Sequence, residues 1–188
     1  MKRIVILASG NGSNAERITQ FFSDNDTAEV VAFLTNKNTA KVLERAKKLR
    51  VAAFSFNKIA FSESDAVVNL LKSLQPDIIV LAGFLWKIPI SMVNAFPKKI
   101  INIHPALLPK YGGKGMYGNH VHQAVKDNHE TETGITIHYV NEHYDEGAII
   151  HQAKVAIEPS DDVETIANKV HQLEYEHFPT TIEKLLED

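Results

Sequence analysis

The 188-residue sequence contains no cysteine. This absence excludes a disulfide framework, a thiolate zinc site and a cysteine nucleophile, and it is compatible with a reducing cytoplasm. Long hydrophobic runs are missing too. The first apolar run, residues 4–8, is shorter than the roughly 7–15 residues of a signal-peptide core, and no segment approaches the ~18 apolar residues of a membrane span. We therefore predict a cytoplasmic protein without a membrane segment, whose first strand, residues 3–8, is buried.

A large excess of one charge is also absent. The formal net charge is −3, which gives no electrostatic reason to expect nucleic acid or an anionic membrane as a partner. The hydrophobic content of 44% and charged content of 23% are close to the averages of soluble globular proteins. We find no repeat, low-complexity tract or linker-like stretch, so we predict a single domain over residues 1–188.

The first half of the chain alternates apolar runs with helical patterns. Near-continuous Ile and Val runs indicate strands that are covered on both faces, which is typical of a parallel sheet with right-handed crossovers. The predicted strands are 3–8, 29–35, 52–56, 77–83 and 99–103, and the predicted helices are 14–24, 39–50, 62–75 and 89–96.

The second half has a different pattern. Two strands, 133–140 and 148–157, follow one another without a helix between them, which predicts an antiparallel pair. A final helix follows, with Ser160 as a candidate N-cap and Pro179 expected to kink or restart it. The predicted fold class is α/β, a doubly wound, mostly parallel sheet with antiparallel strands late in the chain and a C-terminal helix.

The segment "LASGNGSNAERI" (7–18) places Gly10, Gly12 and Ala15 in the G-x-G-x-x-A spacing of a dinucleotide-binding turn. Such folds also need an acidic residue at the end of the second strand, roughly 20 residues further on. The second strand ends instead in Thr35 and Asn36. A dinucleotide site is therefore disfavoured.

The same turn keeps the features that bind one phosphate. Gly10 and Gly12 allow close approach of the backbone, Ser13 supplies a hydroxyl, and a helix start leaves N–H groups free. A tight turn without a ligand is an equally open interpretation of these residues alone.

The segment "IINIHPALLPKYGG" (100–113) contains Asn102 and His104 near the end of a predicted buried strand. Residues two apart on a strand point to the same face, and the carboxyl ends of parallel strands are the usual ligand position. An amide and an imidazolium that point to one place can stabilise an oxyanion. Asp145, in the turn between the two late strands, can project into the same crevice and would raise the pKa of His104. A structural Asn and His, and an ordinary Asx turn at Asp145, remain the alternatives.

Five segments occur in the order "ASGNGSN", "LAGFLWKIP", "INIHPALLPKYGGKG", "TGITIHYVNEHYDEGAII" and "VHQLEYEHFP". Together they resemble the phosphoribosylglycinamide formyltransferases, and the likeness extends over nearly the whole chain. The resemblance implies a Rossmann-like formyltransferase fold and transfer of a formyl group from 10-formyltetrahydrofolate to the amine of glycinamide ribonucleotide, in purine biosynthesis. It implies no metal. The expected partners are small-molecule substrates only, and the protein is expected to be a monomer or a homodimer.

The resemblance also assigns site residues. Asn102, His104 and Asp145 match the catalytic positions, and His104 in its protonated form would serve as general acid. Gly12, Ser13 and Asn14 match the site of the substrate phosphate and its neighbourhood, and Glu174 matches a carboxylate that binds the glycinamide. The implied folate-binding residues are Leu85, Trp86, Lys87, Ile88, Asn102, Asn141, Glu142, His143, Tyr144 and Asp145.

Several positions depart from the family pattern. Trp86 stands where an arginine is familiar, and residues 60–64 contain no arginine, so the partner of the folate tail stays open. The glycine-containing stretch 112–122 is a candidate mobile loop, and Lys110 or Lys114 could add charge near the phosphate. His120 and His122 would diverge on a helix start, so solvated surface histidines are favoured over a metal site.

Other functions make different demands on the sequence. A methionyl-tRNA formyltransferase is expected to have an extra C-terminal domain and a basic face, and a formyltetrahydrofolate deformylase an N-terminal regulatory domain. A non-catalytic nucleotide-binding module would need neither Asn102 nor His104. A dehydrogenase is disfavoured by the missing acidic residue after the second strand.

Overall fold

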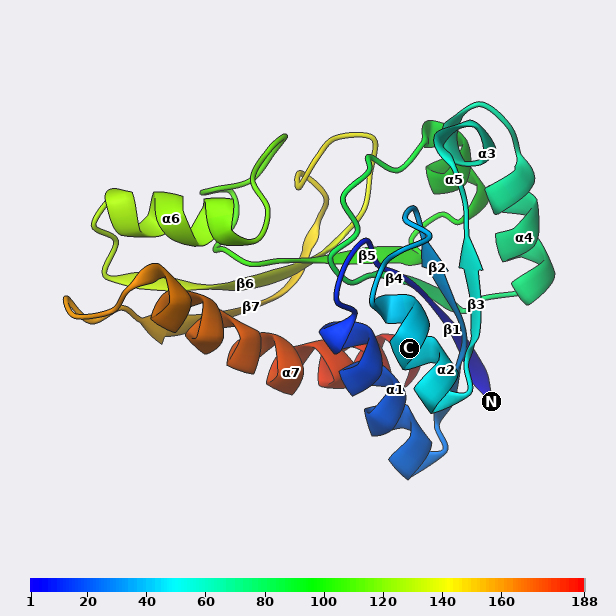
Figure 1. The fold of residues 1–188 in the computed structure, drawn as a ribbon, viewed down its shortest axis with the longest axis horizontal. Helices are drawn as coiled ribbons and strands as arrows, with labels where there is room; N and C mark the ends of the chain where they lie inside the picture. Colours follow the sequence, from blue (N-terminus) through cyan, green and yellow to red (C-terminus); the bar gives the residue numbers. More distant parts are fainter. Residues whose placement is uncertain (188) are drawn as a thin grey trace.

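The computed structural model describes residues 1–187, which form a seven-stranded sheet in the order β3-β2-β1-β4-β5-β6-β7 (Figure 1). The strands are β1 (Lys2–Leu7), β2 (Ala28–Thr35), β3 (Ala52–Ser55), β4 (Ile78–Leu81), β5 (Ile100–His104), β6 (Glu132–Tyr139) and β7 (Ile149–Ala156). The first five pair in parallel, whereas β6 pairs antiparallel with both β5 and β7. The predicted fold class is confirmed, including the late antiparallel pair.

Helices cover both faces of this sheet. They are α1 (Ser13–Asn25), α2 (Val42–Leu49), α3 (Lys58–Ser62), α4 (Ala66–Leu74), α5 (Ile90–Ala95), α6 (Asn119–Asp127) and α7 (Val163–Glu187). In Figure 1, α1 and α7 lie side by side below the sheet, while α3, α4 and α5 gather at the upper right. Among residues 1–187, no helix is both long and apolar enough to cross a bilayer.

The two layers follow from the alternation of side chains along each strand. In β1, Ile4 and Ile6 pack into the core shared with α1, α2 and α7, whereas Val5 and Leu7 pack into the core under α3, α4 and α5. All four side chains are fully buried, and burial of each stabilises the fold by roughly 1.5–3 kcal/mol. Because β1 is buried on both faces, its sequence is a continuous apolar run.

Strand order reverses between β1 and β4. Chain connections from β1 run outward through β2 to β3, and the chain then returns to β4 on the other side of β1. The chain therefore leaves the carboxyl ends of β1 and β4 in opposite directions, which opens a crevice between the following loops at this edge of the sheet. The loops that follow β1, β4 and β5 all lie there.

The predicted helix at 62–75 is wrong in its extent, because two helices occupy this region. Asn57 begins α3 by accepting a hydrogen bond from the Ala60 N–H at 2.9 Å. The chain then leaves the helical path, and α4 begins at Ala66. A polar stretch, "SESD" (62–65), separates the two helices, and such a stretch competes with helical hydrogen bonding.

The predicted N-cap of the last helix is wrong, and so is a restart of the helix at Pro179. Asp162, not Ser160, caps α7, since its Oδ1 accepts from the Thr165 N–H and hydroxyl, each at 2.7 Å. Pro179 lies inside an unbroken helix. A proline leaves the carbonyl four residues earlier without its helical donor, and here Arg17 Nε of α1 donates to that carbonyl, Tyr175 O, at 3.2 Å. Packing against α1 thus supports the helix through the proline.

This capping arrangement makes a direct prediction about stability. Asp162→Ala removes the acceptor for the first turn of α7 and lowers the midpoint of urea unfolding, because the N–H of Thr165 loses its partner. Ser160→Ala is the matched control, and we expect its midpoint to equal that of the wild type. The opposite ranking of the two variants would contradict the assignment of the cap.

Candidate active site

A cavity of about 560 Å³ occupies the crevice at the carboxyl ends of β1, β4 and β5. It is lined by backbone and side chains of residues 10–14, 82–85, 102–105 and 113–119, together with His122, Tyr144, Asp145, His171 and Glu174. Segments far apart in the sequence therefore share one wall. A volume of this size fits a small-molecule substrate.

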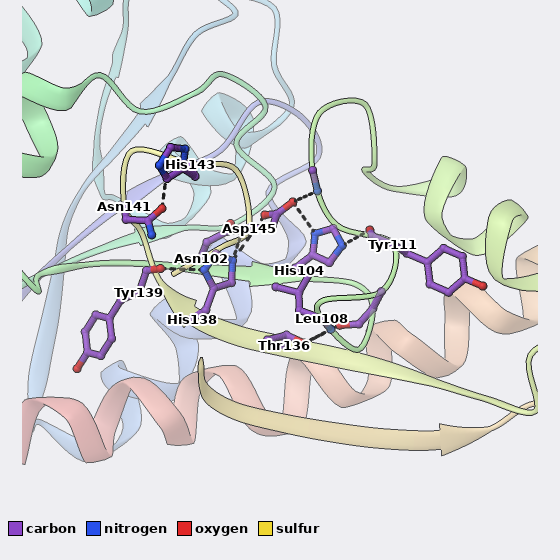
Figure 2. A network of polar contacts seen from close by, with 12 residues as sticks. Asn102, His104, Leu108, Tyr111, Thr136, His138, Tyr139, Asn141, His143 and Asp145 are labelled. Carbon is purple, nitrogen blue, oxygen red and sulfur yellow. Dashed lines mark hydrogen bonds and ion pairs between the residues drawn. The ribbon is translucent and has the colours of Figure 1, made fainter. Parts of the chain in front are cut away.

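Asn102 and His104 enter this cavity from the end of β5, as their spacing predicts (Figure 2). His104 Nε2 lies 2.7 Å from the carbonyl oxygen of Tyr111. Because a carbonyl can only accept, Nε2 carries the hydrogen and Nδ1 is the free nitrogen of the neutral ring. Nδ1 lies 3.6 Å from Oδ2 of Asp145. The three predicted catalytic residues are thus brought together.

Asp145 is held in place by the backbone. It has a left-handed conformation with φ 57°, and its Oδ2 accepts from the Gly113 N–H at 2.9 Å. Its Oδ1 lies 3.6 Å from Nε2 of His138. One carboxylate therefore joins the β6–β7 turn to the loop after β5 and faces two imidazoles.

The charge states of this pair follow from burial and from the neighbours of each group. Burial lowers the pKa of the His104 imidazole, and the opposing effects of the Asp145 carboxylate and the Tyr111 carbonyl do not cancel it. Burial alone would raise the pKa of Asp145, but His138, His104 and the Gly113 N–H together bring it below its ordinary value. Asp145 thus raises the pKa of His104 as expected, but burial outweighs this effect and favours the neutral ring. The resting pair is a neutral imidazole beside an ionised carboxylate.

His138 is a site residue that sequence reasoning missed. Its Nδ1 donates to the Tyr139 carbonyl at 2.8 Å, which leaves Nε2 to accept from the Asn102 amide nitrogen at 3.1 Å. His138 stands opposite Asn102 in the β5–β6 register. It orients the Asn102 amide, whose second N–H stays available to the cavity.

The loop after β1 forms one end of the cavity. Gly12 is the N-cap of α1, with φ 74° and no side-chain cap, so the N–H groups of the first turn are not engaged by a capping side chain. A Cβ at Gly12 would lie 2.5 Å from Val42 Cγ2. Only glycine fits here, and the backbone of Gly12, Ser13 and Asn14 lines the cavity.

Glu174 reaches the same end of the cavity from α7. Its Oε2 accepts from Asn14 Nδ2 and from His171 Nδ1, each at 2.9 Å. The hydrogen bond to Glu174 raises the pKa of the His171 imidazole, and burial opposes this effect. Glu174 is 5% exposed, one of its carboxylate oxygens is fixed by two donors, and the residue lines the cavity.

The predicted folate residues lie mainly around a second, smaller cavity of about 70 Å³, which shares Asn102, Tyr144 and Asp145 with the first. Its other lining residues include Trp86, Lys87, Ile88, Asn141 and His143. Leu85 lines the larger cavity, whereas Glu142 lines neither and its side chain is 60% exposed. All of the predicted folate residues except Glu142 therefore line at least one of the two cavities.

Two expectations about basic residues and histidines are corrected. His122 is not a solvated surface residue: α6 turns Val121, His122 and Val125 inward, and His122 is 2% exposed at the cavity wall. Val121 and Val125, an apolar pair at i and i+4, mark the buried face of α6 and are the sequence signal that could have predicted the burial of His122. Lys110 pairs with Glu130 and lies away from the main cavity, whereas Lys114 lines it. Within residues 1–187, no three candidate ligands are grouped to hold a metal ion.

Comparison with known proteins places this geometry in a family. Residues 2–182 match the sequence profile of the formyl transferases. The chain is 38% identical to the phosphoribosylglycinamide formyltransferase of Bacillus subtilis (strain 168), over 99% of this chain and 95% of that protein. It is 37% identical to the chloroplastic phosphoribosylglycinamide formyltransferase of Arabidopsis thaliana, over 100% of this chain and 66% of that protein. The chain belongs to the phosphoribosylglycinamide formyltransferase family.

Solved structures of this formyltransferase family have the same fold. Glycinamide ribonucleotide transformylase 1 from Symbiobacterium toebii superposes with a TM-score of 0.91 at 30% identity, covering 100% of this chain and 88% of that one. Phosphoribosylglycinamide formyltransferase from Bacillus Halodurans gives a TM-score of 0.88 at 37% identity, covering 98% and 95%. The mixed sheet and the C-terminal helix are thus properties of the formyltransferase fold.

The glycine loop of this formyltransferase makes a testable prediction. Gly12→Ala forces a side chain into Val42 and into a left-handed backbone, so we expect a loss of about 1–3 kcal/mol in the free energy of unfolding. Gly10→Ala is the control, because a Cβ there meets no atom within 4 Å and the backbone is not left-handed. Urea denaturation measures both, and equal destabilisation of the two variants would contradict this account of the loop.

Proposed function

We propose that Asn102, His104 and Asp145 carry out the transfer of a formyl group from 10-formyltetrahydrofolate to the amine of glycinamide ribonucleotide. The observation that carries this proposal is their convergence on one cavity wall, with His104 Nδ1 3.6 Å from Asp145 Oδ2. The glycine loop lies at the same cavity, where helix N–H groups suit a phosphate monoester. Two small molecules could therefore meet beside the three side chains.

Each substrate is assigned to one part of the site. Gly12, Ser13 and Asn14 bind the phosphate of the ribonucleotide, and Glu174 binds its glycinamide group. The pterin enters the smaller cavity between Ile88 and Asn141, where an apolar wall and turn backbone meet. This assignment puts the formyl carbon near Asn102, Tyr144 and Asp145, which both cavities share.

Formyl transfer then follows from the resting charges. The unprotonated amine attacks the formyl carbon, and the carbonyl oxygen becomes an oxyanion that accepts the free N–H of Asn102. The attacking nitrogen loses a proton, which the neutral His104 takes up at Nδ1 directly or through a water. Asp145 stabilises the imidazolium formed in this step.

Collapse of the tetrahedral intermediate completes the reaction. The bond between the formyl carbon and N10 of the folate breaks as the carbonyl reforms. The proton held by His104 passes to N10, so the leaving nitrogen departs neutral. The products are formylglycinamide ribonucleotide and tetrahydrofolate, and His104 returns to its neutral form.

We propose that the reaction takes place in the cytoplasm and involves no macromolecular partner other than a second copy of the chain. The net charge of −3 and the absence of cysteine support this proposal. A spectrophotometric assay with glycinamide ribonucleotide and 10-formyldideazafolate tests the function. Absence of a glycinamide-dependent signal would overturn it.

The role of Asn102 predicts a large effect on turnover. Asn102→Ala removes a donor to the oxyanion, and we expect kcat to fall about 100–1000-fold while the KM of the ribonucleotide changes little. His120→Ala, an exposed histidine on α6, is the control and should keep wild-type kcat. Steady-state kinetics with both substrates measures these values, and full turnover by Asn102→Ala would refute the assignment.

The lowered pKa of His104 predicts the pH dependence of kcat/KM. Since the imidazole must be neutral to accept a proton, activity is lost as pH falls through its pKa, and this acid limb lies below pH 6.5. The Asp145 carboxylate raises the pKa of His104, so Asp145→Asn shifts the limb to still lower pH and also reduces kcat. An acid limb above pH 6.5, or a shift to higher pH in Asp145→Asn, would contradict this mechanism.

A further inference from the structure

A single arginine on α2 contacts the phosphate loop from outside the cavity. Arg45 Nε donates to the backbone carbonyl of Asn11 at 2.8 Å, and Nη2 donates to Asn11 Oδ1 at 3.0 Å. Nη1 forms an ion pair with Glu16 Oε2 in the first turn of α1. All three guanidinium nitrogens of Arg45 are thus engaged, two by Asn11 of the loop and one by Glu16 of α1.

The planar fork fixes Asn11 in two places at once. Two parallel N–H groups constrain both the main chain and the side chain of Asn11, a geometry that a lysine cannot reproduce. On either side of Asn11, Val42 N donates to Gly10 O at 3.1 Å, and Val42 touches Gly12. α2 therefore contacts three consecutive residues of the loop, and within residues 1–187 only Arg45 makes charge-assisted hydrogen bonds to them.

The ion pair with Glu16 has a separate electrostatic effect. A carboxylate in the first turn of α1 lies close to the place where helix N–H groups would bind a phosphate. Its negative charge would repel a phosphate dianion, and the guanidinium of Arg45 compensates that charge. Arg45 is itself partly buried, with its side chain 25% exposed, so this compensation is weakly screened.

We propose that Arg45 is a positioning residue for the substrate phosphate. It acts through Asn11 and Glu16, because its fork is already engaged by those residues, and it holds the loop N–H groups in the geometry that a phosphate monoester requires. This inference rests on the proposed function of the loop at Gly12–Asn14. Arg45 takes no part in the formyl transfer itself.

Kinetics of Arg45→Gln test the proposal. We expect the KM of glycinamide ribonucleotide to rise about 10–100-fold, with kcat at saturation within about twofold of the wild type and the KM of the folate donor unchanged. Arg45→Lys keeps the charge without the fork, so its KM should lie between those of the wild type and Arg45→Gln. Lys48→Ala is the matched control, since it removes one exposed positive charge from the same helix.

A direct binding measurement separates this inference from the proposed function. Titration of the ¹⁵N-labelled protein with inorganic phosphate should shift the amide signals of Gly12 and Ser13 in the wild type, with an affinity that falls about 10–100-fold in Arg45→Gln. If the wild type binds phosphate at these amides but shows no formyl transfer, the proposed function fails and the role of Arg45 stands. If Arg45→Gln binds phosphate as tightly as the wild type, the role of Arg45 is overturned.

A structural defect would have a different signature. General loosening of α2 would raise the KM of both substrates and lower kcat together, and that outcome would also overturn the proposal. Asn11→Ala provides a second variant should Arg45→Gln fold poorly, because it removes only the Nη2 contact. We expect it to raise the KM of the ribonucleotide about 3–10-fold, and an unchanged KM would count against the inference.

Discussion

The Asp145 carboxylate connects the parts of the site that come from different regions of the fold. It accepts the Gly113 N–H, faces Nδ1 of His104 and faces Nε2 of His138. Its side-chain exposure of 11% means that these interactions act in a medium that screens charge poorly. Without the carboxylate, the Gly113 N–H would lose its acceptor, and the loop after β5 would lose its anchor to the β6–β7 turn.

The mixed sheet makes this connection geometrically possible. The parallel strands β1, β4 and β5 deliver the glycine loop, residues 82–85 and the Asn102–His104 pair to one edge. The antiparallel pairing of β5 with β6 then sets His138 beside Asn102, and the turn that follows β6 carries Asp145 back to the same edge. Because β6 is antiparallel to β5, its last residue, Tyr139, stands opposite Ile101 near the start of β5. The following turn folds back from there and brings Asp145 to His104.

Periodicity and local patterns were sufficient for some elements and not for others. The strands, and the position of Asn102 and His104 on the same face of one strand, could be predicted because they depend on side-chain alternation within one segment. His138 could not, because its contact with Asn102 depends on the register between β5 and β6. The continuous helix through Pro179 could not be predicted either, because the donor for the Tyr175 carbonyl comes from Arg17, about 160 residues away in the chain.

The charge state of His104 could not be predicted from the sequence either, because it depends on burial in the folded protein. From sequence, a carboxylate next to an imidazole predicts a raised pKa, and Asp145 does act in that direction. Burial is the larger effect, and it depends on tertiary packing, which places the Tyr111 carbonyl against Nε2 of a ring that is 3% exposed. The same carbonyl fixes the tautomer, so the free nitrogen faces the cavity.

A neutral imidazole beside an ionised carboxylate suits a reaction that must both accept and return a proton. A permanently protonated His104 could bind the oxyanion but could not take the proton that the amine releases. A neutral ring without Asp145 could accept that proton only by creating an isolated buried cation, which is costly. With the carboxylate in place, the charge that develops on the ring is paired as soon as it forms. In the proposed mechanism, the lowered pKa of His104 and the adjacent carboxylate therefore serve successive steps of one proton transfer.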